Sequence, residues 1–203
     1  MGLIYQKEQD MKLTDDRYAG ERSQFELALR MIAHEARTKT IRDCTGLSDD
    51  RIRKLYATYF RDAGRREVKR RRGKSPQQIG LFVKHPQNQL QATTLISLYC
   101  ASLLLRIDGS DKIHSCWPRP DVEYGHRVCR AFETYVLLHS DHKLSFEWAW
   151  NLLQNISRND ELYLAICADC KTRYVQDAYA LDQRMCPSCE IGGGRSKRLQ
   201  GKL

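Results

Sequence analysis

The stretch Cys167-Ala168-Asp169-Cys170 is a C-x-x-C turn, and Cys186-Pro187-Ser188-Cys189, fifteen residues further along the chain, is a second. Two sulfurs three positions apart on a tight turn can bind one ion together, and a second such turn completes a tetrahedron of four thiolates. The spacing is typical of zinc ribbons and zinc knuckles. It predicts one zinc ion per chain, while an iron–sulfur site is the less favoured alternative.

The predicted zinc site is closed, because four thiolates fill the coordination sphere and leave no position for a water molecule. We therefore expect the zinc to stabilise the fold of residues 159–191, a segment too small for a core of its own, and not to catalyse a reaction. A further interpretation is that this module also presents a surface to DNA or to a partner. A basic tail at 192–203 follows the module and contains Arg195, Lys197 and Arg198.

The remaining cysteines do not complete a second ligand set with the histidines, so we predict free thiols at Cys44, Cys100, Cys116 and Cys129. The N-terminal residues lack the basic-then-apolar layout of a signal peptide. The longest apolar stretch, from Leu95 to Leu105, is shorter than the ~20 residues that span a bilayer. We therefore expect a bacterial cytoplasmic protein without membrane contact, in a compartment that keeps cysteines reduced.

The chain before the cysteines is patterned for helices. We expect a flexible N-terminal arm at 1–20 and then a helix that begins at Ser23, where Ser23 and Glu26 form an S-x-x-E capping box. Further helices are predicted over 38–45, 48–59, 88–107 and 121–140, and from 145 onward. The helix over 88–107 is apolar enough to be either central in the fold or covered by another subunit. The predicted fold class is mainly α, with a helical domain at 21–158 and a small four-cysteine, zinc-ribbon-like module.

Residues 38–59 fit a helix-turn-helix-like segment within the helical domain. Gly46 lies where the turn needs a residue that tolerates positive φ. The second helix would turn three basic side chains outward, where they suit phosphate or guanine: Arg51, Arg53 and Lys54. Asp49 and Asp50 at the start of the same helix favour the helix dipole but repel phosphate. An ordinary helical hairpin in the core is therefore the alternative.

The strongest electrostatic signal is a basic run from Arg61 to Lys74. Eight basic and two acidic residues give this window a charge of +6, which is most of the formal net charge of +9 of the whole chain. Such a run suits the phosphate backbone of a nucleic acid, although a solvated loop is the alternative. The candidate phosphate-binding residues in the run are Arg65, Arg66, Lys69, Arg70, Arg71, Arg72 and Lys74.

Several motifs occur in a distinctive order along the chain. They are Leu27-Ala28-Leu29-Arg30-Met31-Ile32, Thr45-Gly46-Leu47-Ser48, Arg51-Ile52-Arg53-Lys54-Leu55-Tyr56, Gly80-Leu81-Phe82, the apolar helix around Leu95 to Leu105, and Ala149-Trp150 ahead of the four cysteines. This order resembles FlhC, the larger subunit of the flagellar master transcriptional activator of bacteria. The resemblance covers the chain from about residue 22 to 190. Two features depart from it: Lys171 stands where glycine is expected, and the arginine run and the N-terminal arm are heavier. In this the chain resembles a divergent relative, such as the activators of conjugative plasmids and integrative elements.

The resemblance implies a DNA-binding transcriptional activator subunit. It implies a hetero-oligomer with a small helical FlhD-like subunit, binding to double-stranded promoter DNA, and recruitment of RNA polymerase. It also implies that zinc is bound by Cys167, Cys170, Cys186 and Cys189.

Two other classes of function fit the residues less well. An RNA-binding or ribosome-associated zinc-ribbon protein is the alternative, but aromatic residues that could stack on bases are sparse in the basic run. For an enzyme, the sequence offers no paired carboxylates at convincing spacing, no glycine-rich phosphate loop and no activated nucleophile. We therefore predict that the chain is not an enzyme.

Overall fold

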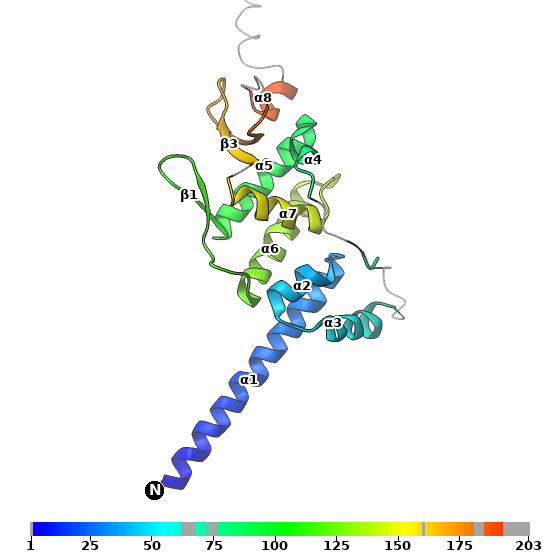
Figure 1. The fold of residues 1–203 in the computed structure, drawn as a ribbon, viewed down its shortest axis with the longest axis vertical. Helices are drawn as coiled ribbons and strands as arrows, with labels where there is room; N and C mark the ends of the chain where they lie inside the picture. Colours follow the sequence, from blue (N-terminus) through cyan, green and yellow to red (C-terminus); the bar gives the residue numbers. More distant parts are fainter. Residues whose placement is uncertain are drawn as a thin grey trace, which may run out of the picture. The chain divides into compact units, whose positions relative to one another are not determined.

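The computed structural model describes residues 2–61, 68–71, 73, 77–159, 161–180 and 185–192, and it is mainly helical, as predicted (Figure 1). The chain forms two compact units, the first from residues 1–72 and 120–126 and the second from residues 73–119 and 127–203. No helix in the described part of the chain is both long and apolar enough to cross a membrane.

Within its described residues, the first unit contains the helices α1 (Gly2–Ala33), α2 (Thr38–Thr45) and α3 (Asp49–Tyr56) and the π-helical turn η1 (Ala57–Arg61). In the second unit lie α4 (Gly80–Val83), α5 (Pro86–Ala101), α7 (Phe146–Ile156) and α8 (Pro187–Ile191), while α6 (Val122–Leu138) belongs partly to each unit. Two antiparallel hairpins complete the second unit. In these, β1 (Leu105–Ile107) pairs with β2 (Ile113–Ser115), and β3 (Leu162–Ile166) pairs with β4 (Arg173–Asp177).

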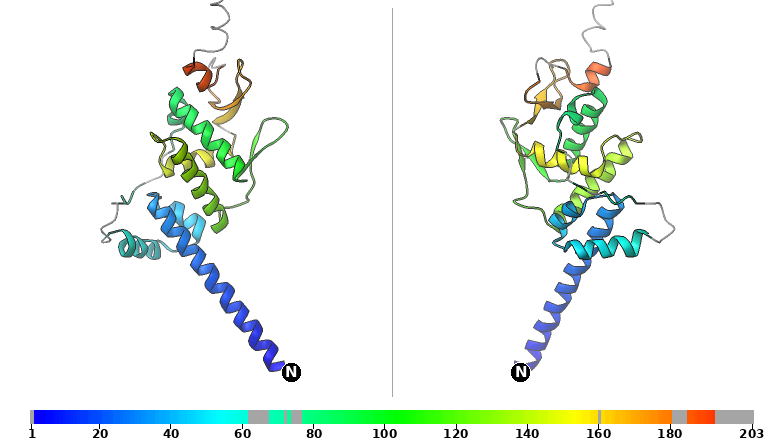
Figure 2. Two further views of the ribbon diagram at one scale, coloured as in Figure 1. Left: turned by 180° about the vertical axis from the view of Figure 1, so that it is seen from behind. Right: turned by 45° about the vertical axis from the view of Figure 1, so that its right-hand side comes forward.

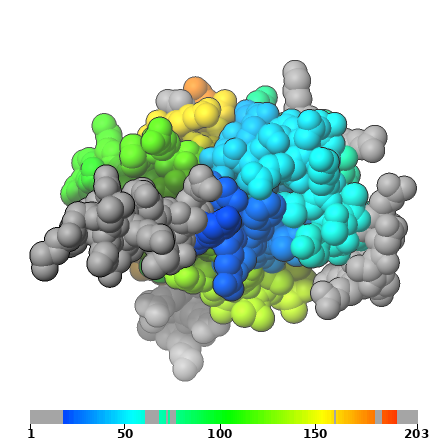
Figure 3. All heavy atoms as spheres, turned by 90° about the horizontal axis from the view of Figure 1, so that it is seen from below, coloured from blue at the N-terminus to red at the C-terminus, as the bar shows by residue number. Residues whose placement is uncertain are grey.

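The core of the first unit forms where α1, α2 and α3 pack together, and Figure 3 shows the exposed side of α1 beside α2 and α3. Its buried apolar side chains include Leu27, Ala28, Met31, Ile32, Ile41, Cys44, Leu47, Ile52 and Leu55. Residues 120–126 pack against this core through Gly125. A Cβ atom at Gly125 would lie 2.5 Å from Leu27 Cδ2 and 3.1 Å from Cys44 Cβ, so a larger residue there would require the buried Leu27 side chain to shift.

The connection between α2 and α3 follows the sequence prediction. Gly46 adopts φ 70° and donates its backbone N–H to Arg42 O, which ends α2. The Ser48 hydroxyl then accepts the N–H of Arg51 at 3.4 Å and caps the start of α3. Both predicted helix boundaries are confirmed, because the local residues alone satisfy the backbone groups at these ends.

The start of the first helix differs from the prediction. Helix α1 begins at Gly2 and includes residues 2–20, where the sequence suggests an arm. Ser23 therefore lies inside the helix and caps nothing, and the predicted capping box is wrong. Glu26 instead pairs with Arg22, one turn away on the same exposed face, with an Arg22 Nε–Glu26 Oε1 distance of 2.7 Å.

Helix α5 is the central element of the second unit. It contacts α4, α7, α8, β1 and β4, and Figure 2 shows it among these elements. Its buried apolar residues are Ala92, Leu95, Ile96 and Tyr99. The sequence left two alternatives for this helix, a central position in the fold or burial by another subunit. The contacts show that it is central in the fold of the second unit. The predicted end at residue 107 is wrong, because Leu103 adopts φ 56° after the last turn and the chain continues as β1.

Candidate metal centre

The four cysteines of the two C-x-x-C turns come together in the second unit. Cys167 follows directly on β3, and Cys170 lies in the turn after it. Cys186 is the N-cap of α8, and Cys189 lies within that helix. The four Sγ atoms all lie within 4.8 Å of one another, so the predicted ligand set is assembled by the fold.

The first turn is held by backbone hydrogen bonds between its own residues. Cys167 donates its N–H to Thr172 O at 3.0 Å, and Lys171 donates its N–H to Cys167 O at 3.1 Å. Lys171 adopts φ 62°, the left-handed conformation that favours glycine. This explains why glycine is expected at this position, and it shows that the fold keeps its geometry with lysine there.

The second turn uses the start of a short helix. Pro187 occupies the first helical position, where its missing N–H is not needed. The N–H of Cys186 points to the other turn and donates to Cys167 Sγ at 3.2 Å. This bond connects the two cysteine pairs through the backbone and orients a sulfur lone pair.

The geometry of the four sulfurs fits a single tetrahedral metal ion. Ligand sulfurs at about 2.3 Å from an ion stand about 3.8 Å apart from one another. The Sγ atoms of Cys170 and Cys186 are 3.5 Å apart, and all the others fall within the same small cluster. Cys167 and Cys186 are buried and pack with Tyr174, so one side of the site is closed to water.

The pKa values of the four thiols also favour a cation at the centre of the cluster. Hydrogen bonds from the hydroxyl and the backbone N–H of Thr172 lower the pKa of Cys170 to about 6, which favours the thiolate form that binds metals. A hydrogen bond to Cys170 holds the proton on Cys189 and raises the pKa of Cys189 well above its usual range. Burial raises the pKa of Cys186 as well. Four thiolates this close therefore need a positive ion among them to stay deprotonated together.

Buried polar contacts join the metal module to α5. The Gln89 side chain donates to Val175 O at 2.8 Å and to Gln176 Oε1 at 2.9 Å, and the Thr93 hydroxyl accepts the N–H of Val175 at 3.1 Å. Gln89 and Gln176 are each only 1% exposed. The backbone of β4 thus obtains part of its hydrogen bonding from α5, so the module and the helix depend on each other.

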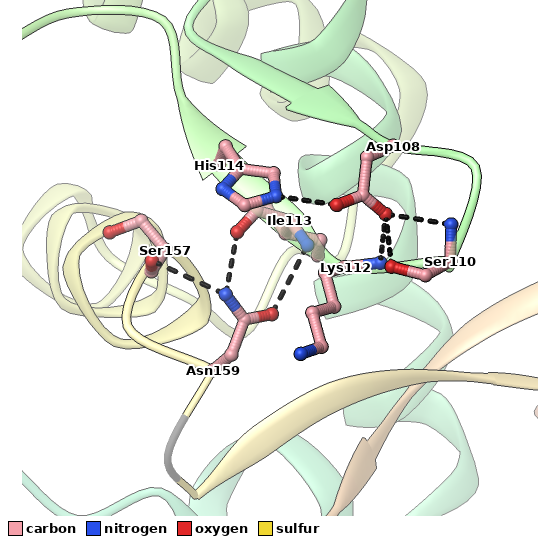
Figure 4. A network of polar contacts seen from close by, with 7 residues as sticks. All are labelled: Asp108, Ser110, Lys112, Ile113, His114, Ser157 and Asn159. Carbon is pink, nitrogen blue, oxygen red and sulfur yellow. Dashed lines mark hydrogen bonds and ion pairs between the residues drawn. The ribbon is translucent and has the colours of Figure 1, made fainter.

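A second set of polar contacts fixes the β1–β2 loop (Figure 4). The Asp108 carboxylate accepts hydrogen bonds from the His114 ring at 2.7 Å, and from Ser110 and the N–H of Lys112. These bonds, that from His114 first, hold the pKa of Asp108 below its usual range. His114 therefore has a structural partner in this loop.

The same loop is connected to the metal module and to the end of α7. Asp111 Oδ1 accepts hydrogen bonds from Arg173 Nη2 at 2.6 Å and from Arg173 Nε at 2.8 Å. Arg173 follows the first cysteine turn. Asn159 Oδ1 accepts a hydrogen bond from the backbone N–H of Ile113 at 3.1 Å, and Asn159 Nδ2 donates one to Ile113 O at 2.6 Å (Figure 4). Sequence reasoning missed these contacts, because no local pattern marks a partner 46 or 62 positions away.

The structure describes six of the basic residues that the sequence nominates for nucleic acid, and all six are exposed: Arg51, Arg53, Lys54, Lys69, Arg70 and Arg71. Arg51 lies over the ring of Phe25, 4.8 Å from its centroid. Arg53 pairs with Asp50 at 3.1 Å on the same helix, and Arg71 pairs with Glu35 at 2.7 Å. Seven further candidates lie outside the described residues: Arg65, Arg66, Arg72, Lys74, Arg195, Lys197 and Arg198.

Residues 68–71 of the basic run are part of the first unit and lie beside its helices. The Tyr56 hydroxyl donates to Val68 O, which places the run beside the end of α3. Lys69 and Arg70 border a surface hollow that Ile32, Ile41 and Ile52 line from the helices. Residues 68–71 therefore lie beside Ile52 and Tyr56 of α3 in this unit.

No family model and no curated protein matches this sequence.

Replacing Lys171 with glycine is expected to stabilise the metal-loaded protein by up to about 1 kcal/mol, because glycine adopts positive φ without steric cost. The exposed bond from Lys171 Nζ to Ala168 O is lost and offsets part of the gain. Denaturant unfolding measures the difference. Lys171→Ala is the matched control, since it loses the same bond but keeps the Cβ atom. A glycine variant no more stable than the alanine variant would contradict strain at this position.

Proposed function

We propose that this chain is a DNA-binding subunit of a bacterial, cytoplasmic transcriptional activator, and that one structural zinc ion holds its C-terminal module together. The observation that carries the proposal is the exposed basic segment at 68–71, which the Tyr56 hydroxyl holds beside α3. A surface that gathers cations from two segments suits a polyanion with regularly spaced phosphates. The resemblance to FlhC supports double-stranded promoter DNA as that polyanion.

Zinc is the metal that the donor set supports best. Four thiolates in two C-x-x-C turns are the ligands of structural zinc sites. The distance of 3.5 Å between the Cys170 and Cys186 sulfurs suits ligands of one ion, whereas cysteines that ligate different irons of a cluster would stand farther apart. The zinc would have four protein ligands, so its role is to stabilise the fold.

The start of α3 contributes less to DNA binding than the basic segment does. Asp49 pairs with Arg42 at 3.0 Å and Asp50 pairs with Arg53 at 3.1 Å, so two arginines near this helix end already have carboxylate partners. Lys54, Lys69 and Arg70 are exposed on the same unit. We therefore assign the principal phosphate contacts to these three residues and expect a helix-turn-helix-like role for α2 and α3 only in positioning them.

The resemblance also supports a small helical FlhD-like partner and RNA polymerase as further partners. The second unit offers apolar side chains for such contacts, since Leu103 and Leu138 are each 62% exposed and Leu137 is 85% exposed. Leu137 and Leu138 are neighbours at the end of α6, and adjacent exposed apolar side chains can form part of an interaction surface. Co-purification with a small helical protein encoded next to this chain tests the partner.

DNA binding is expected to weaken steeply as the salt concentration rises. If about five phosphates are neutralised, the logarithm of the binding constant falls with the logarithm of the salt concentration with a slope of about −4.5. Fluorescence anisotropy with promoter duplexes from the neighbouring genes measures this slope, with the chain alone and with its partner. A duplex of the same length and scrambled sequence is the control. Absence of binding to any duplex at 50 mM salt would refute the proposal.

RNA binding is the second candidate, and two exposed tyrosines of the metal module favour it. Tyr163 on β3 is 42% exposed and Tyr179 just after β4 is 77% exposed, and rings of this kind can stack on unpaired bases. Competition between a structured RNA and the promoter duplex separates the two candidates. Preference for the RNA, lost in Tyr179→Ala, would favour this second function.

A further inference from the structure

Glu35 occupies an unusual backbone position at the end of α1. It adopts φ 60°, the left-handed conformation, and its N–H donates to Ile32 O at 2.8 Å while the next N–H, from Ala36, donates to Met31 O at 3.0 Å. Glycine or asparagine is the usual residue at such a helix end, because a larger side chain is disfavoured there. A glutamate at this position therefore suggests that its side chain has a role that offsets the strain.

The Glu35 carboxylate lies against the basic segment. Its Oε2 atom accepts a hydrogen bond from Arg71 Nε at 2.8 Å and lies 2.7 Å from Arg71 Nη2. Its Oε1 atom accepts a hydrogen bond from the backbone N–H of Lys69 at 3.4 Å. A guanidinium fork together with a backbone N–H is the kind of donor set that proteins also use for a phosphate oxygen. The carboxylate thus fills a position where an external anion could be bound.

The surroundings of this position are open to such an anion. Lys69 and Arg70 are exposed, and the Arg71 side chain is 47% exposed. The Tyr56 hydroxyl holds the segment by a hydrogen bond to Val68 O. The Glu35 side chain is 27% exposed, so an anion from solvent can reach the ion pair and replace the carboxylate. A phosphate that took its place would meet Arg71 and the N–H of Lys69, with Lys69 and Arg70 side chains nearby.

We propose that Lys69 N–H and the Arg71 guanidinium form a subsite for one nucleic-acid phosphate, and that Glu35 occupies this subsite in the free protein as an internal competitor. The proposal rests on the proposed DNA-binding function and adds a regulatory element to it. The phosphate displaces the carboxylate, so each binding event must first break the Glu35–Arg71 pair. Glu35 therefore weakens binding to every duplex by about the same factor.

The test uses the metal-loaded full chain and a promoter duplex. Glu35→Gln removes the competing charge and is expected to tighten binding about two- to fivefold, the range for one exposed ion pair. The salt slope stays the same, because the same phosphates are contacted. Glu26→Gln is the matched control, since Glu26 also pairs with an arginine on an exposed face of this unit and its replacement changes the net charge equally. Its effect is expected to stay below half of the gain from Glu35→Gln.

A double-mutant cycle makes the test specific to Arg71. The gain from Glu35→Gln should vanish in a chain that already carries Arg71→Gln. Glu35→Asn is a second variant, because asparagine tolerates the left-handed backbone and is too short to reach Arg71; it should also tighten binding. Weaker binding by both Glu35 variants with unchanged circular dichroism would overturn the proposal and indicate that Glu35 orders the segment. A gain that persists without Arg71 would also overturn it and indicate a general effect of net charge.

Inorganic pyrophosphate separates this proposal from the proposed function. In the Glu35→Gln chain, pyrophosphate should shift the amide resonance of Lys69, and the unsubstituted chain should respond only at much higher concentration. If no duplex binds but this shift is seen, the subsite stands and DNA binding fails. If duplexes bind and pyrophosphate shifts the Lys69 amide in neither chain, DNA binding stands and the subsite fails.

Discussion

Replacing Cys186 with serine is expected to abolish stoichiometric metal binding and to unfold the second unit. Binding of structural zinc is worth about 10–16 kcal/mol in small zinc modules, which equals or exceeds the whole stability of a typical domain at about 5–15 kcal/mol. The loss would not stay local, because β4 shares buried hydrogen bonds with Gln89 and Thr93 of α5. Without the metal, these groups lose their partners in the middle of the unit.

Elemental analysis and thermal unfolding followed by circular dichroism measure this result, with a strong chelator as the parallel treatment of the unsubstituted chain. Cys116→Ser is the matched control, since Cys116 is an exposed cysteine outside the cluster. It should keep one metal ion per chain and an unchanged melting temperature. A Cys186→Ser chain that melts like the control, or an unsubstituted chain that carries no stoichiometric metal, would show that the cluster is not a structural metal site.

Neutralising the basic segment is expected to have the largest effect on DNA affinity. Combined Lys69→Gln, Arg70→Gln and Arg71→Gln should remove two of the principal phosphate contacts and the contact inferred for Arg71. The magnitude of the salt slope should then fall by about 2.7. At 0.1 M salt this corresponds to a loss of about 10²–10³-fold in affinity. Fluorescence anisotropy at several salt concentrations measures both quantities.

The control for this result removes the same charge from another part of the chain. Arg106, Lys112 and Arg119 are exposed residues of the second unit, and their combined replacement by glutamine should leave the salt slope within about one unit of its original value. Equal losses in both triple variants would mean that only net charge matters, and the segment at 68–71 would then not be the phosphate-binding surface.

Local signals in the sequence predict much of this structure. The two C-x-x-C pairs predict the sulfur cluster, because each pair needs only its own turn to present two ligands. Gly46 and Ser48 predict the turn between α2 and α3 for the same reason. Where the local signal is ambiguous the prediction fails: Ser23 and Glu26 match a capping box, but the surrounding residues continue the helix on both sides.

The contacts between distant segments could not be predicted in the same way. Gln89 reads as an ordinary polar residue, yet it is buried against β4, 86 positions further along the chain. Glu35 and Arg71 are likewise unremarkable in the sequence and meet only because Glu35 ends α1 and Tyr56 holds the segment at 68–71. The predicted end of α5 is wrong because apolar residues continue past Ala101 into β1, and a buried strand and a buried helix share that composition.

The seven residues from Pro120 to His126 complete a unit whose other residues end at Arg72. A truncated fragment that stops at residue 72 would lack Gly125 and would expose Leu27 and Cys44, which are 0% and 2% accessible in the intact chain. Such a fragment is expected to self-associate, and its failure to bind DNA would say little about the native surface. Dissection of this protein is therefore better done by point substitution in the intact polypeptide than by expressing its halves.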